Sequence, residues 1–257
     1  MKNGTFKSVI SYTLYRMYEN ILIFILVIII IIVSLFYTST YNRIPKKIWT
    51  YSEHPRSKVL DMCIANWIEL NPGYEVVVLT RKTYKGYITI PVDILMHPNF
   101  HDSATRFSEL VRLWTLAEHG GIWMDLVRMN EPLDKWLFPK YGEFSGYMHN
   151  GILPSLMACN KNSSFMKAWR DEFSTIVHYQ NVEEYIKNKA NTETSAIQIA
   201  GDIAMKMSDS LILRKAVDGP YKYLVDCKWN SNKAVLIQER YPLVIFREEE
   251  RRALEKR

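Results

Sequence analysis

Residues 104–125 read ATRFSELVRLWTLAEHGGIWMD. Apolar side chains recur at helical spacing from Phe107 to Leu116, which predicts an amphipathic helix over residues 104–119. Two glycines then end the helix, because glycine tolerates the left-handed conformation of a C-terminal cap. The three apolar residues after them predict a short buried strand, and Asp125 follows at its carboxyl end. Ligands of open α/β sheets bind outside the carboxyl ends of strands, so Asp125 is a candidate site residue.

The sequence before this stretch predicts a strand, a helix and a second strand. Residues 46–51 alternate as a strand does, and residues 56–70 place apolar side chains at helical spacing. Residues 74–80 read YEVVVLT, the β-branched and apolar composition of a buried strand. This order indicates a βαβ unit, and hence an α/β domain with a parallel sheet.

The sequence after Asp125 predicts further helices and two late strands. Helical spacing is found at residues 164–178, 181–188 and 194–207. Two short segments are strand-like in composition, residues 221–225 and 234–238.

An apolar segment precedes the body of the chain. Residues 21–37 read ILIFILVIIIIIVSLFY and carry no charge. As a helix they span about 26 Å, near the lower limit for crossing a bilayer. No small-x-small cleavage site follows closely, so we expect an anchor rather than a cleaved signal peptide. The lack of any polar face argues against a core helix.

These patterns divide the chain of 257 residues into five parts. We expect an N-terminal tail (1–20), a transmembrane anchor (21–37), a short stem (38–45), one folded domain (46–245) and a charged C-terminal tail (246–257). The body is long enough for one well-cored domain and too short for two comfortable ones.

Composition excludes several classes of function. The net charge is +6 and the pI is about 9.0, but basic residues are spread along the chain and no nucleic-acid-binding signature is present. The tail 246–257 mixes both charges at helical spacing, which is typical of a solvated helix. Cys63, Cys159 and Cys227 form no CxxC pair, which leaves either three buried thiols or one bridge and a free thiol. No GxSxG, phosphate loop or GxGxxG is present.

Several motifs in register resemble a known family. They are Ile44–Tyr51 (IPKKIWTY), Cys63–Trp67 (CIANW), Asn71–Val76 (NPGYEV), Ser108–Leu113 (SELVRL) and Leu116–Asp125 (LAEHGGIWMD). Their order and spacing resemble the capsular polysaccharide synthesis proteins and the wider group of DXD-containing glycosyltransferases. The resemblance implies a GT-A-type, Rossmann-like domain, a UDP- or GDP-sugar donor, a glycan or glycoconjugate acceptor and usually a retaining reaction.

The resemblance also implies roles at the donor sugar. Asp125 matches the first acid of the family's metal and nucleotide motif, which contacts the donor's ribose or a bound Mn²⁺ or Mg²⁺ ion. Glu109 and Arg112 lie one helical turn apart and share a face. They match an Asp and an Arg that contact the donor sugar, and Ser108 is a weaker candidate beside them.

Trp49 and Tyr51 end the first predicted strand, where relatives stack the nucleotide base. Trp49 could equally be a core residue.

The chain departs from the family pattern at Val127, where the motif often has a second Asp. A valine cannot bind a metal, since hard divalent ions need oxygen ligands. Glu131 or Asp134 could replace the missing ligand, or Arg128 could face the diphosphate instead.

We therefore expect a single-pass membrane glycosyltransferase that moves a hexose-type sugar. The alternative is a non-catalytic relative that binds nucleotide or glycan. Basic residues are balanced across the apolar segment and do not set its orientation. The expected function favours a type II protein with its body in a Golgi- or ER-like lumen, where the sequon at Asn162 could be glycosylated.

Overall fold

The computed structural model describes residues 16–33, 44–53, 57–136, 143–190, 194–208 and 210–256. The chain divides into two units, residues 1–41 and 42–257. The described part of the first unit is the helix Arg16–Val33, which is long and apolar enough to cross a membrane. It overlaps the predicted anchor, of which residues 34–37 lie outside the described part.

The second unit is an α/β domain around a six-stranded sheet in the order β2-β1-β3-β6-β5-β7. Its strands are β1 (Lys47–Tyr51), β2 (Glu75–Leu79), β3 (Gly121–Met124), β5 (Phe144–Met148), β6 (Ile152–Cys159) and β7 (Leu211–Lys215). Only β6 runs antiparallel to its neighbours. A separate antiparallel ribbon is formed by β4 (Val127–Met129) and β8 (Leu243–Ile245). The predicted α/β fold class with a parallel-rich sheet is confirmed.

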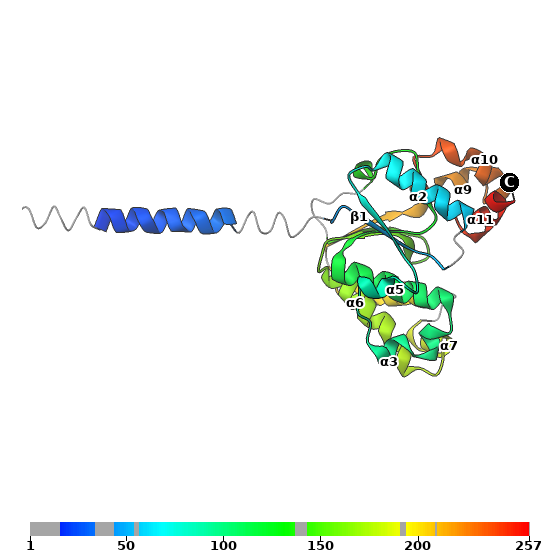
Figure 1. Cartoon of the computed structure of the whole chain (residues 1–257), viewed down its shortest axis with the longest axis horizontal. Helices are drawn as coiled ribbons and strands as arrows, with labels where there is room; N and C mark the ends of the chain where they lie inside the picture. The colour runs from blue at the N-terminus through cyan, green and yellow to red at the C-terminus, as the bar shows by residue number, and fades with distance from the viewer. Residues whose placement is uncertain are drawn as a thin grey trace, which may run out of the picture. The chain divides into compact units, whose positions relative to one another are not determined.

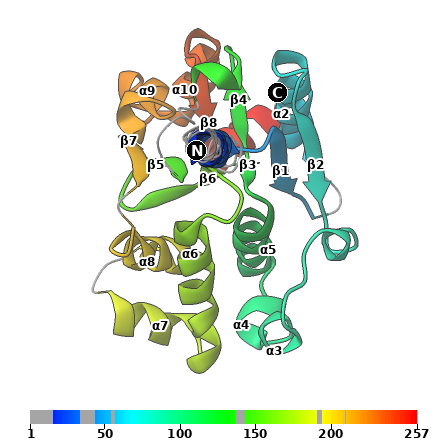
Figure 2. The ribbon, with the colours of Figure 1, turned by 90° about the vertical axis from the view of Figure 1, so that its left-hand side faces the viewer.

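Helices cover both faces of the sheet, as Figures 1 and 2 show. One face carries α2 (Lys58–Leu70), α9 (Lys222–Asp226), α10 (Ser231–Ile237) and α11 (Glu248–Glu255). The other carries α3 (Val92–Leu95), α4 (Pro98–His101), α5 (Ala104–His119), α6 (Ser164–Ser174), α7 (Val182–Lys189) and α8 (Ala196–Met205). Each face has its own apolar core, so the sheet is buried on both sides, as parallel sheets are.

The predicted βαβ unit is present. β1 pairs in parallel with β2 and with β3, so that Ile48 lies between Val76 and Ile122. The carboxyl ends of these three strands therefore meet at one edge of the sheet, where Asp125 follows β3.

Helix α5 and strand β3 follow the sequence pattern closely. Ser103 caps the first turn of α5 by accepting a hydrogen bond from the N–H of Arg106. Gly120 ends the helix with φ +64°, and a Cβ there would lie 2.7 Å from the backbone of Asn160. The reversal into β3 thus requires glycine for both its dihedral angle and its close contact.

The prediction of strands at residues 221–225 and 234–238 is wrong, because these residues lie largely in α9 and α10. Local interactions favour the helices. Lys222 and Asp226 pair one turn apart at 2.7 Å, and Asn230 caps α10 by accepting from the N–H of Lys233. The late strands lie elsewhere, as β7 and β8.

The segment predicted as a solvated C-terminal tail packs on the domain. Its helix α11 contacts α2 and α10, and the Glu250 side chain is fully buried. The three cysteines are free and buried, which selects one of the two alternatives left open by the sequence.

Candidate functional site

Asp125 and Arg112 form an ion pair at the carboxyl end of β3. Nη2 of Arg112 lies 2.7 Å from Oδ2 of Asp125, and Nε1 of Trp123 donates to Oδ1 at 2.7 Å. The guanidinium also lies 5.2 Å from the centre of the Trp123 ring. The Arg112 side chain is 7% exposed and that of Asp125 is 29% exposed. The carboxylate is therefore held in one orientation, while part of the Asp125 side chain stays exposed.

The backbone on both sides of this carboxylate is anchored to neighbouring elements. The N–H of Asp125 donates to the carbonyl of Ser155 on β6 at 3.0 Å. Trp67 of α2 donates from Nε1 to the carbonyl of Val127 at 2.6 Å. These bonds hold the bend between β3 and β4, and with it the direction of the Asp125 side chain.

Glu109 lies one turn before Arg112 on α5. Burial raises its pKa to about 7, with a smaller contribution from the Asp125 charge, against the lowering effect of Arg112 and Arg106. Burial also raises the pKa of Asp125, opposed by the Arg112 charge and the Trp123 hydrogen bond. At neutral pH Glu109 is thus present in both forms and can donate or accept hydrogen bonds.

Tyr51 faces the start of α5. Its ring lies 5.9 Å from the Phe107 ring, and its hydroxyl donates to Oε1 of Glu53 at 2.7 Å. Arg81 donates to the same carboxylate oxygen at 2.8 Å and lies 4.1 Å over Phe107. These residues make a polar and aromatic group at the carboxyl ends of β1 and β2.

The other candidates on these elements point elsewhere. Trp49 is buried in the core, where Nε1 donates to the carbonyl of Gly120 at 2.9 Å. The Ser108 hydroxyl donates to the carbonyl of Thr105 at 2.7 Å, within its own helix. Trp49 is thus a core residue, and the Ser108 hydroxyl is bonded to the backbone of its own helix.

Arg128 is not gathered with Arg112 and Asp125. It lies on β4 and pairs with Oε1 of Glu239 at 3.2 Å.

The family model for capsular polysaccharide synthesis proteins matches residues 36–194, more than half of the chain. The chain belongs to this family. No curated protein matches it in sequence.

Solved structures similar to this family member are glycosyltransferases. The PaToxG glycosyltransferase is 13% identical at a TM-score of 0.45, over 87% of this chain and 91% of that one. The glycosyltransferase GlyE of Streptococcus pneumoniae TIGR4 is 10% identical at a TM-score of 0.48, over 81% and 56%. The galactosyltransferase LgtC is 11% identical at a TM-score of 0.44, over 78% and 86%.

The side chains around Asp125 do not by themselves assemble a set of metal ligands in this family member. Both Asp125 oxygens already accept hydrogen bonds, and Val127 is buried and apolar. Asp134 accepts from the Tyr74 hydroxyl at 2.7 Å, while Glu131 lies 3.5 Å from Lys135. In the described part of the chain no three His, Cys, Asp or Glu side chains are grouped as metal ligands. The suggested replacement ligands are thus engaged elsewhere.

The structure also brings forward side chains to which the sequence assigned no role. His149 follows β5, and its ring stacks on that of Trp229 with centres 5.4 Å apart. Tyr221 packs edge-on against both rings, and the Arg247 guanidinium lies 5.1 Å from the Trp229 centre. Spacing along the chain gave no signal for this group, because its members come from four separate segments.

Proposed function

We propose that this glycosyltransferase domain moves a hexose-type sugar from a UDP- or GDP-sugar to a glycan or glycoconjugate acceptor, with retention at the anomeric carbon. The observation that carries the proposal is the Arg112–Asp125 pair at the carboxyl end of β3, in which the Asp125 side chain is partly exposed. Family membership supports the transferase class, and the donor, sugar and stereochemistry are our extension of it.

The chemistry of donor cleavage explains the residue types. When the bond from sugar to diphosphate breaks, negative charge grows on the leaving oxygen and positive charge on the sugar ring. Asp125 offers a fixed acceptor for a donor hydroxyl, and its charge is balanced by Arg112. Glu109 lies on the same helix face as Arg112 and can bond a sugar hydroxyl in either protonation state. We assign these three residues to the donor sugar.

The group around Tyr51 is the proposed nucleotide end of the site. Phe107 supplies a second ring, and Glu53 offers a carboxylate acceptor for a base or ribose N–H or O–H. Parallel strands bring this group and Asp125 to the same sheet edge. A donor lying along that edge reaches both.

GT-A glycosyltransferases generally use a divalent metal ion. The described residues of this chain do not assemble its ligands, so we assign no step to a metal. The dependence of donor turnover on Mn²⁺ or Mg²⁺ is left to be measured in the assay below.

The test is donor turnover by the full-length chain in detergent, with UDP- and GDP-sugars, with and without Mn²⁺. We expect release of the nucleoside diphosphate, and its loss in Asp125→Ala. The control is Asp171→Ala, an exposed carboxylate on α6 that pairs with its neighbour Arg170. Equal turnover in Asp125→Ala and the unaltered chain would reject the assignment.

A non-catalytic relative remains the second candidate, favoured by the buried Val127 in place of a metal ligand. It predicts saturable binding of UDP or GDP with no turnover of any donor in either metal condition. The same assay, joined to a nucleotide-binding measurement, separates the two.

We also propose that the helix Arg16–Val33 anchors the protein as a type II membrane protein with a lumenal body. The test is protease treatment of sealed microsomes that carry the full-length chain. Protection of the body supports this orientation, and digestion without detergent places the body in the cytosol. A mass shift lost in Asn162→Gln would show lumenal glycosylation independently.

A further inference from the structure

The C-terminal segment reaches the site through the β4–β8 ribbon. Val127 pairs with Ile245, and the N–H of Phe246 donates to the carbonyl of Leu126 at 2.8 Å. Arg247 follows Phe246 directly, so its backbone lies one residue beyond this contact with the segment that carries Asp125. The C-terminal segment thus contacts the chain directly after Asp125, although the two are more than one hundred residues apart in sequence.

Arg247 joins an aromatic cluster made of His149, Tyr221 and Trp229. The His149 and Trp229 rings stack at an interplanar angle of 26°, and the Tyr221 ring stands at 87° to His149 and 73° to Trp229. Tyr221 is buried, whereas Trp229 is 39% exposed. The cluster therefore exposes part of the Trp229 ring, which packs on buried Tyr221.

The backbone that carries this cluster adopts costly conformations. Asn150, Lys228 and Trp229 have φ of +52°, +54° and +60°. Asparagine tolerates a left-handed conformation, but this conformation costs Lys228 and Trp229 about 1 kcal/mol or more each, and such residues gather at functional sites. The N–H of Trp229 is fixed by the carbonyl of Leu224 at 2.7 Å. These dihedral angles hold the Trp229 ring partly exposed while it packs on His149 and Tyr221.

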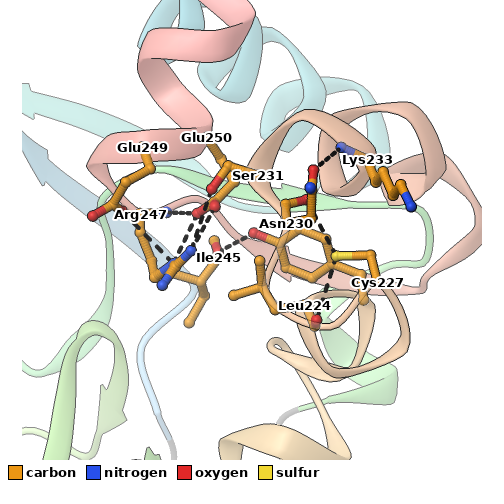
Figure 3. A network of polar contacts seen from close by, with 10 residues as sticks. Leu224, Cys227, Asn230, Ser231, Lys233, Ile245, Arg247, Glu249 and Glu250 are labelled. Carbon is orange, nitrogen blue, oxygen red and sulfur yellow. Dashed lines mark hydrogen bonds and ion pairs between the residues drawn. The ribbon is translucent and has the colours of Figure 1, made fainter.

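The charge of the cluster indicates which ligand it suits. Glu250 is fully buried, and its carboxylate accepts two hydrogen bonds from Arg247 (Figure 3). Nε of Arg247 donates to Oε2 at 3.0 Å, and Nη2 donates to Oε1 at 2.7 Å. Glu249 lies 3.8 Å from the same guanidinium. The cation is already neutralised, so the cluster is a poor partner for a diphosphate. It suits a neutral ligand with apolar C–H groups for the ring and hydroxyls for Arg247 and Glu249.

We propose that His149, Tyr221, Trp229 and Arg247 form the acceptor subsite, which binds a neutral sugar residue of the acceptor against the Trp229 ring. Nε and Nη2 of Arg247 are held by Glu250, which leaves Nη1 outside these bonds to donate to a sugar hydroxyl. The inference rests on the proposed function, because an acceptor subsite has a role only beside a donor site.

The test compares two substitutions at adjacent left-handed positions. Trp229→Asn removes the ring and keeps a residue that tolerates this conformation, whereas Lys228→Asn is the matched control. The full-length chain in detergent is saturated with whichever of UDP and GDP it binds more tightly. Binding of the methyl α- and β-glycosides of glucose, galactose and mannose is then measured by saturation-transfer NMR.

We expect at least one glycoside to bind, with affinity reduced tenfold or more by Trp229→Asn and restored in large part by Trp229→Tyr. Lys228→Asn should change glycoside affinity less than twofold. Nucleotide affinity should change less than twofold in all three variants, which also shows that they are folded.

Three results would overturn the inference: no glycoside binding by the unaltered chain, equal binding by Trp229→Asn, or loss of nucleotide affinity in Trp229→Asn alone. Failure of the proposed function has a different signature. In that case the unaltered chain binds neither UDP nor GDP, or Asp125→Ala leaves donor turnover unchanged.

Discussion

Nη2 of Arg112 lies 2.7 Å from Oδ2 of Asp125, while Nε of the same guanidinium is buried without a hydrogen-bond partner in the described part of the chain. A buried donor left unpaired costs about 1–3 kcal/mol. The guanidinium therefore keeps its hydrogen bond to the Asp125 carboxylate although its Nε makes none. Buried groups that lack a partner are more common at functional sites than in pairs that only stabilise the fold.

Arg112→Lys tests whether the guanidinium shape matters. Lysine keeps the charge but loses the planar contact with Trp123 and the fixed direction of the bond to Asp125. We expect donor turnover to fall tenfold or more with little change in nucleotide affinity.

The control for this substitution is Arg170→Lys on α6. Arg170 pairs with Asp171 at 2.7 Å and lies 5.2 Å over Trp114, the same contacts in a different place. It should leave turnover within twofold. Similar losses in both variants would mean that general destabilisation, and not the site, explains the effect.

Glu109→Gln should change stability in a pH-dependent way. The carboxyl has an ordinary pKa of 4.5 in the unfolded chain and about 7 when folded. The native state therefore loses stability as pH rises from 4.5 to 7, and the loss is complete above pH 7. At 1.36 kcal/mol per pKa unit it reaches at most about 3 kcal/mol. Glutamine removes this cost.

Thermal unfolding of the full-length chain in detergent gives the measurement. Glu109→Gln should raise Tm at pH 8 and leave it nearly unchanged at pH 4.5. Glu69→Gln, on the exposed face of α2, should give the same small change at both pH values. A larger stabilisation by Glu109→Gln at pH 4.5 than at pH 8 would contradict the sign.

Gly120→Ala should destabilise the domain strongly. Alanine is strained at φ +64°, and its Cβ would lie 2.6 Å from the backbone N of Lys161. We expect a loss of about 2–4 kcal/mol in the free energy of unfolding, measured with urea. Gly86→Ala meets no atom within 4 Å and should change it by about 0.5 kcal/mol or less. Equal effects would show that the turn into β3 is less constrained than its geometry indicates.

Glu250→Gln should destabilise α11 and the ribbon before it. Burial raises the pKa of Glu250, but hydrogen bonds from Arg247 and Ser231 outweigh burial, so the net pKa lies below the ordinary 4.5. The charged form thus stabilises the native state above pH 4.5, and that contribution is lost as pH falls through the folded pKa. We expect Glu250→Gln to cost about 3 kcal/mol at pH 7.

Glu249→Gln is the control for this prediction, since that side chain is 63% exposed and 3.8 Å from Arg247. It should cost about 0.5 kcal/mol or less in the same urea titration at pH 7. If the Glu250 variant cost as little, the bidentate pair with Arg247 would contribute nothing to stability.

Local patterns explain what the sequence predicted well. The order β1-α2-β2, helix α5 and the strand before Asp125 all follow from apolar periodicity and from glycine at the reversal. The pairing of Arg112 with Asp125 depends on these elements, because α5 packs against β1 and β3 and Arg112 reaches the residue that follows β3.

Non-local pairing explains what the sequence did not predict. β8 pairs with β4 across more than one hundred residues, and neither strand is longer than three residues. Strands this short lack a readable alternation. The position of the segment after β8 depends on this ribbon, so a charged helix in sequence could not be distinguished from a solvated tail.

The β4–β8 ribbon can form only after β8 has been synthesised, late in translation. During synthesis, residues 104–125 leave the ribosome long before residues 243–250, so the aromatic cluster is completed last. A nascent chain interrupted between them would carry β4 without its ribbon partner β8. Such a fragment is expected to expose the apolar edge of β4, where Val127 and Met129 are otherwise covered.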